Sequence, residues 1–278
     1  MRRTRIEATR RTGCAGLPSV RPLTGARTGS RVARFRATRV LAGIRRKAPV
    51  WLSSATLLAI AAAGGLYAQS GVPEGYELVY SQDFTDASVL DDFTFSDQRA
   101  WAYGAGDWRG YLDLKGGGRY KPKHRSPLNI ALIDDLLLAD FVLEVEAWQT
   151  GREYGHRDLS LFFGFEGPNR YYYAHLATEP DDRAHNIFLV DNADRTPMGA
   201  IPDEGVDWDR GWKRVRVERQ DGSLRVYFDG EKQPTVSTDR DPLGWGRVGF
   251  GSFDDTGRFS KVRIWAPDSR RAQASAFK

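Results

Sequence analysis

Residues 212–230, WKRVRVERQDGSLRVYFDG, decide the fold class of this chain. Two runs of alternating apolar and polar side chains flank Gln220-Asp221-Gly222-Ser223, and an Asp-Gly pair in this setting is a strong signal for a β-hairpin. Val215 and Val217 lie on the face that we expect to be buried, because strand side chains alternate between two faces. The opposite face is an ordinary solvated surface to which we assign no function, and it consists of Trp212, Arg214, Arg216 and Glu218.

Similar short runs, rich in Val, Ile, Leu, Phe, Tyr and Trp, recur from Tyr76 to Trp265 and are separated by Gly, Pro, Asp or Asn. No helical apolar period is sustained in this part of the sequence. Many short strands at this spacing indicate an antiparallel sandwich or barrel, and roughly 195 residues suffice for one core but not for two. We therefore predict an all-β fold, an antiparallel two-sheet β-sandwich or jelly roll, over residues 72–267.

The sequence outside this domain has other properties. Residues 40–70 are predicted to be a signal peptide, since residues 50–68 are apolar and uncharged and follow Arg45-Arg46-Lys47. An uncleaved membrane anchor is the alternative, because a run of this length spans a bilayer. We therefore expect a secreted or periplasmic protein, or else a membrane-anchored, extracytoplasmic one. Residues 1–39, an Arg-rich stretch that we interpret as an over-extended start, and residues 268–278 are expected to be disordered.

The basic isoelectric point of about 9.3 does not describe the predicted domain. Residues 1–70 hold 14 of the 41 Lys and Arg residues but only one of the 36 acids, so residues 71–278 have a formal charge of −8. This argues against nucleic acid as a partner and weakly against other polyanions. The only cysteine is Cys14, so the domain has no disulfide.

Residues 170–195, RYYYAHLATEPDDRAHNIFLVDNADR, contain the strongest indication of function. Alternation places Tyr171, Tyr173 and His175 together on the outward face of one strand. Aromatic rings beside an imidazole suit sugar binding or acid–base chemistry. Asp181, His185 and Arg195 follow, and we expect them to form the rim of the same site.

Two earlier runs add acids and one more aromatic ring. In FVLEVEAWQ (141–149) the outward set is Glu144, Glu146 and Trp148, and in RDLSLFFGF (157–165) it includes Asp158. We expect these strands to lie next to the tyrosine strand, so that all of these side chains line one open groove that binds an oligo- or polysaccharide.

Two kinds of glycan-cleaving enzyme are compatible with this set. A glycoside hydrolase needs two carboxyl groups in one cleft, which Glu144 and Glu146 would supply. A polysaccharide lyase needs a base, Tyr173 or His175, and a cation such as Arg195 near the uronate. The hydrolase is our first prediction and the lyase the second. A non-catalytic lectin-like module is the alternative, and a structural envelope protein remains a third class.

The closing segments resemble a known superfamily. ADFVLEVEAW, NRYYYAHL, GWKRVRVERQDGSLRVYFDG and GWGRVGFGSFDDTGRFSKVRIW, in this order, resemble the concanavalin A-like lectin/glucanase superfamily and, within it, secreted 3-keto-disaccharide hydrolase-type domains. DLSLFFGF and YYYAHL stand where those domains have an Asn-Ser-Gly-containing strand and a Gly-Tyr-Glu strand, so we do not carry over their activity. The resemblance implies a jelly roll, in which lectins, hydrolases and lyases all occur. The E-x-D-x-x-E strand of glucanases is absent.

The resemblance also implies a structural calcium ion, which many such jelly rolls bind. Asp83, Asp254 and Asp255 would supply the hard oxygen ligands that calcium prefers. The alternative is that these aspartates stabilise turns through hydrogen bonds to their own backbone.

Overall fold

A computed structural model describes residues 71–106, 109–209, 211–272 and 275–277. Within these ranges the regular elements are β-strands and two short 3-10 helices. They are β1 (Glu77–Gln82), η1 (Ala87–Asp92), β2 (Phe93–Phe95), η2 (Gln98–Ala100), β3 (Trp101–Ala105), β4 (Gly110–Leu114), β5 (Asn129–Ile133), β6 (Phe141–Gln149), β7 (Asp158–Gly167), β8 (Arg170–Ala177), β9 (Asn186–Asp191), β10 (Thr196–Pro197), β11 (Lys213–Gln220), β12 (Ser223–Phe228), β13 (Val236–Thr238), β14 (Arg247–Ser252) and β15 (Gly257–Ala266).

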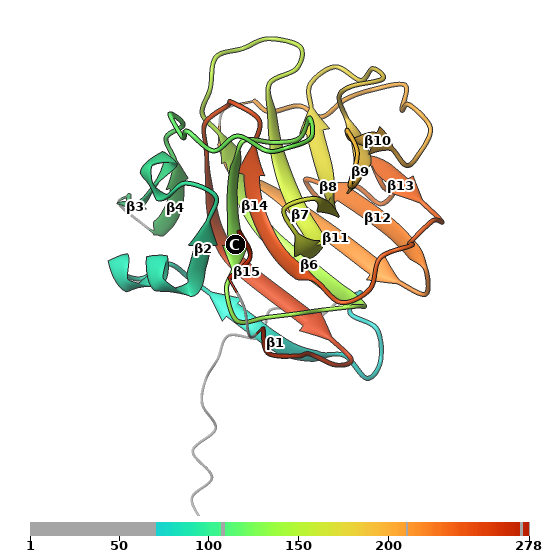
Figure 1. The fold of residues 1–278 in the computed structure, drawn as a ribbon, viewed down its shortest axis with the longest axis horizontal. Coiled ribbons are helices and arrows are strands. Elements are labelled where there is room, and N and C mark those ends of the chain that lie inside the picture. The colour runs from blue at the N-terminus through green and yellow to red at the C-terminus, as the bar shows by residue number, and fades with distance from the viewer. Residues whose placement is uncertain (1–70, 107–108, 210, 273–274, 278) are drawn as a thin grey trace, which may run out of the picture. The chain divides into compact units, whose positions relative to one another are not determined.

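The strands form two sheets that pack face to face (Figure 1). Sheet A has the order β13-β12-β11-β6-β15-β4-β3, with β1 paired to β15, and sheet B has the order β10-β9-β8-β7-β14-β5-β2. Strands that are neighbours in these sheets pair antiparallel. The predicted fold class, an antiparallel two-sheet β-sandwich, is therefore confirmed, as is the architecture that the superfamily resemblance implied.

The β11–β12 hairpin follows the expected pattern. Val217 pairs with Val226, and the connecting Asp221 and Gly222 have φ values of 50° and 79°. Positive φ at both central positions belongs to a type I′ turn, whose twist matches that of the strands it joins.

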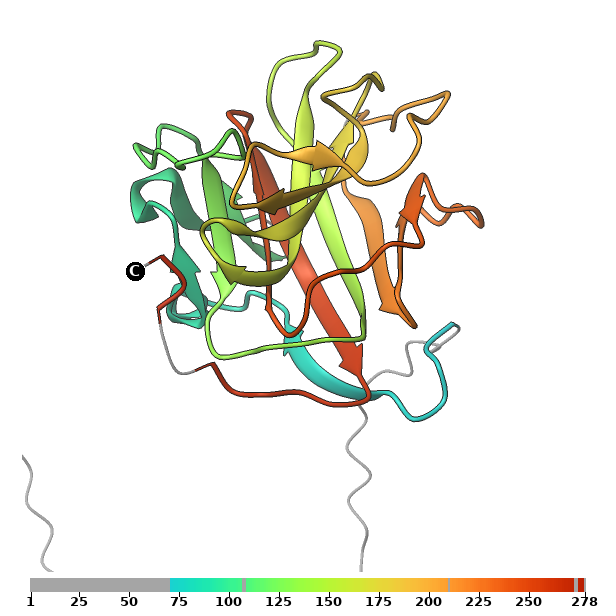
Figure 2. The same cartoon turned by 45° about the vertical axis from the view of Figure 1, so that its right-hand side comes forward.

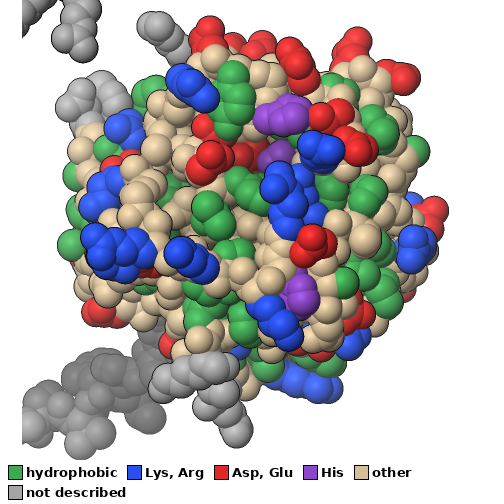
Figure 3. All heavy atoms as spheres, turned by 45° about the horizontal axis from the view of Figure 1, so that its top comes forward, with side chains coloured by type: hydrophobic (Ala, Val, Ile, Leu, Met, Phe, Trp, Pro, Cys, Tyr) green, Lys and Arg blue, Asp and Glu red, His purple; other side chains and the backbone are tan. Residues whose placement is uncertain are grey.

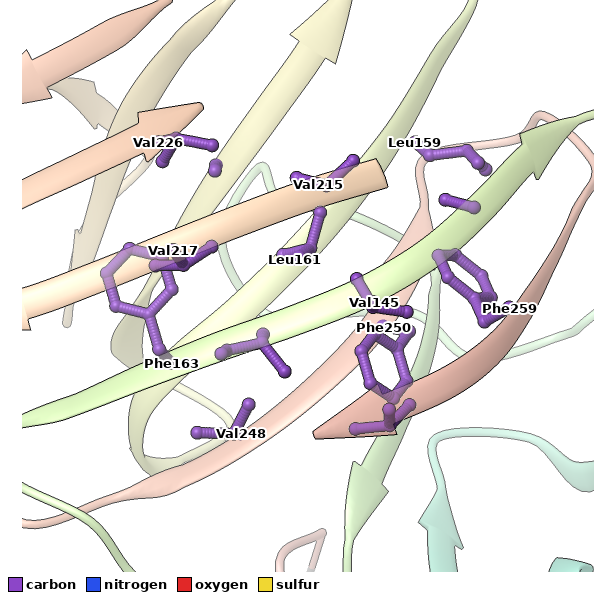
Figure 4. Packing of buried hydrophobic residues seen from close by; sticks show 14 of the residues in the cluster. Val145, Leu159, Leu161, Phe163, Val215, Val217, Val226, Val248, Phe250 and Phe259 are labelled. Carbon is purple, nitrogen blue, oxygen red and sulfur yellow. The ribbon is translucent and has the colours of Figure 1, made fainter. Parts of the chain in front are cut away.

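The main core lies between the two inner sheet faces. Sheet A contributes Val145 and Val215, and sheet B contributes Leu161, Phe163 and Phe250, all with no exposed surface apart from 1 % of Val145. Figure 4 shows these side chains pointing into the space between the layers. The alternation expected for FVLEVEAWQ and RDLSLFFGF thus holds on the inward side.

The strands β6 and β7 follow one another in the chain but belong to opposite sheets. Residues 150–157 lead from one layer to the other. The prediction that the outward faces of β6, β7 and β8 form one groove floor is therefore wrong. The outward side chains of β6 lie on the far side of the sandwich from those of β7 and β8.

The outer face of sheet B is covered by a second apolar cluster. Its buried members include Phe165, Tyr171 and Tyr173, and Phe277 packs against it together with Tyr120. Figures 1 and 2 both place the C-terminal end beside the part of sheet B that contains β2 and β5. The segment before β5 and the end of the chain thus form a cover over this face.

The described part of residues 268–278 differs from the disordered tail that we predicted. Arg270 forms a β-bridge with Leu137, and Ala276 is 4 % exposed. Apolar Ala276 and Phe277 provide the packing that we did not anticipate in a polar segment. The extension (1–39) and the signal peptide or anchor (40–70) lie outside the described residues. Among the residues that are described, no helix is long and apolar enough to cross a membrane.

Candidate functional site

The tyrosines predicted to line an open groove are buried. Tyr171 and Tyr173 point away from the main core, as alternation predicted, but both have 0 % exposed surface. Tyr171 stacks on Phe165 with ring centroids 4.7 Å apart, and Tyr173 stacks on Phe188 at 5.3 Å. Burial raises the pKa of the Tyr173 hydroxyl far above its ordinary value, which disfavours the tyrosinate that a lyase base requires. Neither ring offers a free face to a sugar.

His175 belongs to a buried polar network rather than to an open site. Its Nε2 lies 3.3 Å from Asp158 Oδ2, and its Nδ1 accepts a hydrogen bond of 3.2 Å from the His185 backbone N–H. The hydroxyls of Ser160 and Ser252 donate to the same Asp158 carboxylate, at 3.0 and 2.9 Å. Because both serines donate to the carboxylate and not to the imidazole, His175 activates neither of them as a nucleophile.

The network extends to the loops at one end of the sandwich. Asp255 Oδ2 accepts hydrogen bonds from the Tyr154 hydroxyl at 2.7 Å and from the Asp158 backbone N–H at 2.9 Å. Burial raises the pKa of Asp255 to about 6. Burial also lowers the pKa of His185 to about 4, and its Nε2 lies 2.9 Å from the Thr235 hydroxyl. His185 is thus a neutral packing residue at neutral pH and does not form a rim.

Arg195 is held in place by its neighbours. Its guanidinium lies between Phe188 and Phe253, 4.6 and 4.5 Å from the ring centroids. Nη1 donates to the Tyr173 hydroxyl at 2.9 Å and Nη2 to the Arg183 carbonyl at 2.6 Å. Both terminal nitrogens of Arg195 thus donate hydrogen bonds within the protein. The side chain covers the aromatic cluster instead of offering its guanidinium to a ligand.

The remaining predicted rim residue, Asp181, lies at the surface with its Oδ2 2.8 Å from His156 Nε2. His156 therefore lies in the loop before β7, close to the strands that carry His175 and His185, and Figure 3 shows histidine surface on one face beside basic and acidic side chains.

The two predicted catalytic carboxylates lie on the outer face of sheet A. Glu144 accepts from Arg216 at 2.8 Å, and Glu146 pairs with both Arg109 and Lys261. The sandwich core separates them from His175 and Tyr173 by about 10 Å or more, the usual spacing of packed sheets. These four predicted catalytic residues therefore do not act together on one bond.

An aromatic cluster adjoins these carboxylates. Trp148 meets Trp212 edge to face, with ring centroids 5.8 Å apart, and Tyr111 lies 6.1 Å from Trp212. All three rings are partly exposed. Arg258 lies over Tyr111 and Trp148, and Arg109 lies over Trp212 at 4.8 Å. The cluster thus combines ring surface with guanidinium donors.

The sequence interpretation included Trp148 but missed Trp212, Tyr111 and Arg109. Trp212 was assigned to a solvated face without function. Register explains its position, since Lys213 pairs with Ala147 and so brings Trp212 opposite Trp148. The adjacent aromatic and charged residues were visible in the sequence, but the pairing of β6 with β11 was not.

Two shallow hollows lie beside this cluster. The larger, of about 460 Å³, is lined by Arg109, Glu146, Trp212, Arg214, Asp229 and Gly230. A second, of about 290 Å³, shares Arg214 and Gly230 with the first and extends towards Tyr227. Partly exposed rings, charged side chains and a depression thus coincide on the outer face of sheet A.

The three predicted calcium ligands are not brought together. Asp83 pairs with Arg263 at 2.6 Å near the end of β15, whereas Asp254 and Asp255 precede the start of that strand. In the described ranges there is no group of three or more His, Cys, Asp or Glu side chains that could hold a metal ion. The calcium ion stays a prediction, and the set of three ligands is not supported.

No protein-family model matches this sequence, and no curated protein matches it. Several solved structures are similar in fold. The carbohydrate-binding module CBM66 from Bacillus subtilis shares 14% identity over 62% of this chain and 93% of its own, with a TM-score of 0.44. Domain 4 of AbnA, a GH43 extracellular arabinanase from Geobacillus stearothermophilus, shares 10% identity over 71% of this chain and 95% of that domain, with a TM-score of 0.43.

The GH43 protein BlXynB from Bacillus licheniformis shares 14% identity with a TM-score of 0.44, and the match covers 67% of this chain but only 39% of that protein. At these levels of similarity we transfer neither a ligand nor a site from these proteins. The similarity to these structures does not show the narrower resemblance to 3-keto-disaccharide hydrolase-type domains, which stays a prediction.

Proposed function

We propose that this protein binds an oligo- or polysaccharide through the outer face of sheet A, with Trp148 and Trp212 as the stacking platform. The observation that supports the proposal most directly is the partly exposed Trp148–Trp212 pair beside a hollow of about 460 Å³. Indole rings offer apolar faces to the C–H side of a sugar ring, and neighbouring charged groups hydrogen-bond its hydroxyls. Glu146, Arg109 and Arg214 are such groups at this hollow.

Binding is better supported than bond cleavage. A hydrolase needs one carboxyl group that is protonated and a second that is free to act. Glu144 and Glu146 are instead each held by cations, at 2.8 Å from Arg216 in the case of Glu144. The other candidate acids and bases, Asp158 and His175, are buried in the opposite layer. The geometry therefore favours the lectin-like alternative over the hydrolase and the lyase.

The proposed setting is extracytoplasmic, because the signal peptide or anchor expected in residues 40–70 would export the domain. A domain without cysteine is compatible with either cellular compartment, so export remains to be tested by detecting the N-terminus of the mature protein. A surface-exposed or secreted location would bring the hollow into contact with polysaccharides outside the cell.

A polysaccharide panel tests the proposed function. We expect Trp212→Ala and Trp148→Ala each to weaken binding about fivefold or more, because the stacking of a planar ring on an aromatic side chain contributes about 1–3 kcal/mol. Trp245→Ala is the matched control, since Trp245 is also partly exposed but packs against Arg270 away from the hollow. Binding is measured by affinity electrophoresis and calorimetry.

The same panel distinguishes binding from catalysis. Reducing-end release and ultraviolet absorbance of unsaturated products are recorded for each polymer. Unchanged affinity in both tryptophan variants would contradict the location of the site. Turnover that disappears in Glu146→Gln would contradict the assignment of a non-catalytic role.

A further inference from the structure

We propose that the hollow beside Trp212 selects an acidic sugar, and that Arg214 is the residue that receives its carboxylate. This inference rests on the proposed function, because it specifies the class of sugar for the same face. It follows from the position of Arg214, from the ion pairs that neighbouring carboxylates form with other cations, and from the local balance of charge.

Arg214 lies where a ligand on this face would meet it. Its side chain is exposed, and it lines both the hollow of about 460 Å³ and the neighbouring one of about 290 Å³. Trp212, the stacking ring, lies two residues earlier and lines the larger hollow. A sugar stacked on Trp212 would therefore place its substituents beside this guanidinium.

Arg214 makes no ion pair with any residue in the described part of the chain, although Glu146 is its direct cross-strand neighbour in the β6–β11 register. Glu146 is engaged elsewhere, since Oε2 accepts from Arg109 and Oε1 from Lys261 at 3.3 Å. The carboxylate of Asp229, which also lines the hollow, accepts from Lys213 at 3.0 Å. Both carboxylates that line the larger hollow with Arg214 are thus already paired with another cation.

The surplus of positive charge is local. At the Trp212 end there are four cations and three carboxylates, because Glu146 pairs with Arg109 and Lys261, Lys213 pairs with Asp229 and Asp209, and Arg214 adds one further positive charge. In the second hollow the balance is reversed, because three carboxylates line it with only two cations, Arg214 and Arg216. The carboxylates are those of Glu144, Glu218 and Glu231. A local cationic hollow attracts an anion even though residues 71–278 have a formal charge of −8.

The chemistry of guanidinium favours a carboxylate over a hydroxyl. Its planar N–H groups match the two oxygens of a carboxylate in a bidentate pair, and such charge-assisted bonds are about twice as strong as neutral ones. A uronic acid residue combines this group with a ring that stacks on indole. A neutral sugar would gain the stacking but not the ion pair.

Two polymers that differ only in the free carboxylate test the inference, namely polygalacturonate and its fully methyl-esterified form. We expect the protein to bind polygalacturonate roughly tenfold or more tightly, and Arg214→Gln to remove most of that preference. Arg225→Gln is the matched control, because Arg225 projects from β12 outside both hollows and pairs with Asp239. Poly-L-glutamate, a polyanion without sugar rings, controls for unspecific attraction.

The outcomes separate this inference from the proposed function. Equal binding of both polymers, lost in Trp212→Ala, would overturn the role of Arg214 and leave sugar binding in place. Binding of poly-L-glutamate as tight as that of polygalacturonate would overturn the selection of an acidic sugar. A preference for polygalacturonate that survives in Arg214→Gln would also overturn it. Failure to bind any polymer of the wider panel would contradict the proposed function itself.

Discussion

The outer faces of the two sheets carry similar residue types but have opposite structural roles. On sheet B, Tyr171 and Tyr173 have no exposed surface, because Phe277, Tyr120 and Phe253 pack over them. On sheet A, Trp148 and Trp212 remain partly exposed beside a hollow. An aromatic side chain on the outward face of a strand is thus available to a ligand only where no distant segment covers it.

The polar groups of the two faces differ in the same way. Asp158 and His175 are satisfied within a buried network that links β7, β8 and the loops above them. The charged groups of sheet A form surface pairs such as Arg258–Asp113, at 3.4 Å and partly solvated. Buried networks of this kind specify packing, whereas solvated pairs exchange partners at little cost. The first face stabilises the fold, and the second is the face to which we propose that a sugar binds.

The largest expected effect comes from replacing one aromatic residue on each face and comparing the two losses of stability. Tyr171→Ala should lower the free energy of unfolding by about 3–5 kcal/mol, because it leaves a cavity in a buried cluster. Trp148→Ala should cost only about 1 kcal/mol, since its ring is already partly solvated. Urea unfolding followed by circular dichroism measures both.

Tyr171→Phe controls for the hydroxyl, since it keeps the ring that stacks on Phe165. It should retain most of the stability that Tyr171→Ala loses. Equal losses for Tyr171→Ala and Trp148→Ala would contradict the distinction between a covered and an open face.

The local sequence pattern predicted the sandwich, and it predicted which side chains of each strand point into the core. It did not predict the location of the candidate site. The inward set Tyr172, Ala174 and Leu176 was correctly separated from Tyr171 and Tyr173, because alternation is a property of the strand itself. Burial of the outward pair depends on residues about fifty positions earlier and a hundred positions later, such as Tyr120 and Phe277. No local pattern contains that contact.

The sequence also did not show which strands belong to the same sheet. FVLEVEAWQ and RDLSLFFGF follow one another with a short connection, which fits either a hairpin or a passage between layers. The structure has the passage, so Glu144 and Glu146 meet β11 and β15 instead of β7. The partner of Trp148 was therefore Trp212, a residue to which the sequence analysis gave no role.

The buried network of sheet B should also differ from sheet A in its response to pH. Because burial raises the pKa of Asp255 from 3.8 to about 6, the folded state binds a proton more tightly than the unfolded one there. The stabilisation that this group contributes is complete below pH 4 and is lost as the pH rises through about 6. Asp255→Asn should remove this loss and be more stable than the parent by about 1–3 kcal/mol at pH 8.

Below pH 4 the Asp255→Asn protein and the parent should have nearly equal stability, since both side chains are then neutral. Asp254→Asn, which changes the exposed neighbour, should leave the pH profile unaltered. Urea unfolding at a series of pH values measures the three proteins. A parent stability that does not fall relative to Asp255→Asn between pH 4 and pH 8 would contradict the proposed effect of burial.

The smallest expected effect concerns the edge of the cover over sheet B. Phe277 contacts Tyr120 and Phe165 edge to face, with ring centroids 5.6 and 5.5 Å apart, but it is itself partly exposed. Phe277→Ala should therefore cost only about 1 kcal/mol, the order of one or two such aromatic contacts. It should also speed amide hydrogen exchange in β8, where Tyr171 lies beneath the cover, while leaving exchange in β6 and β11 of sheet A unchanged.

Ser275→Ala, at an exposed position of the same segment, is the control. If the exchange rate in β8 of Phe277→Ala equals that of the parent, the prediction is wrong. The residues before β5 would then cover the outer face of sheet B without the end of the chain.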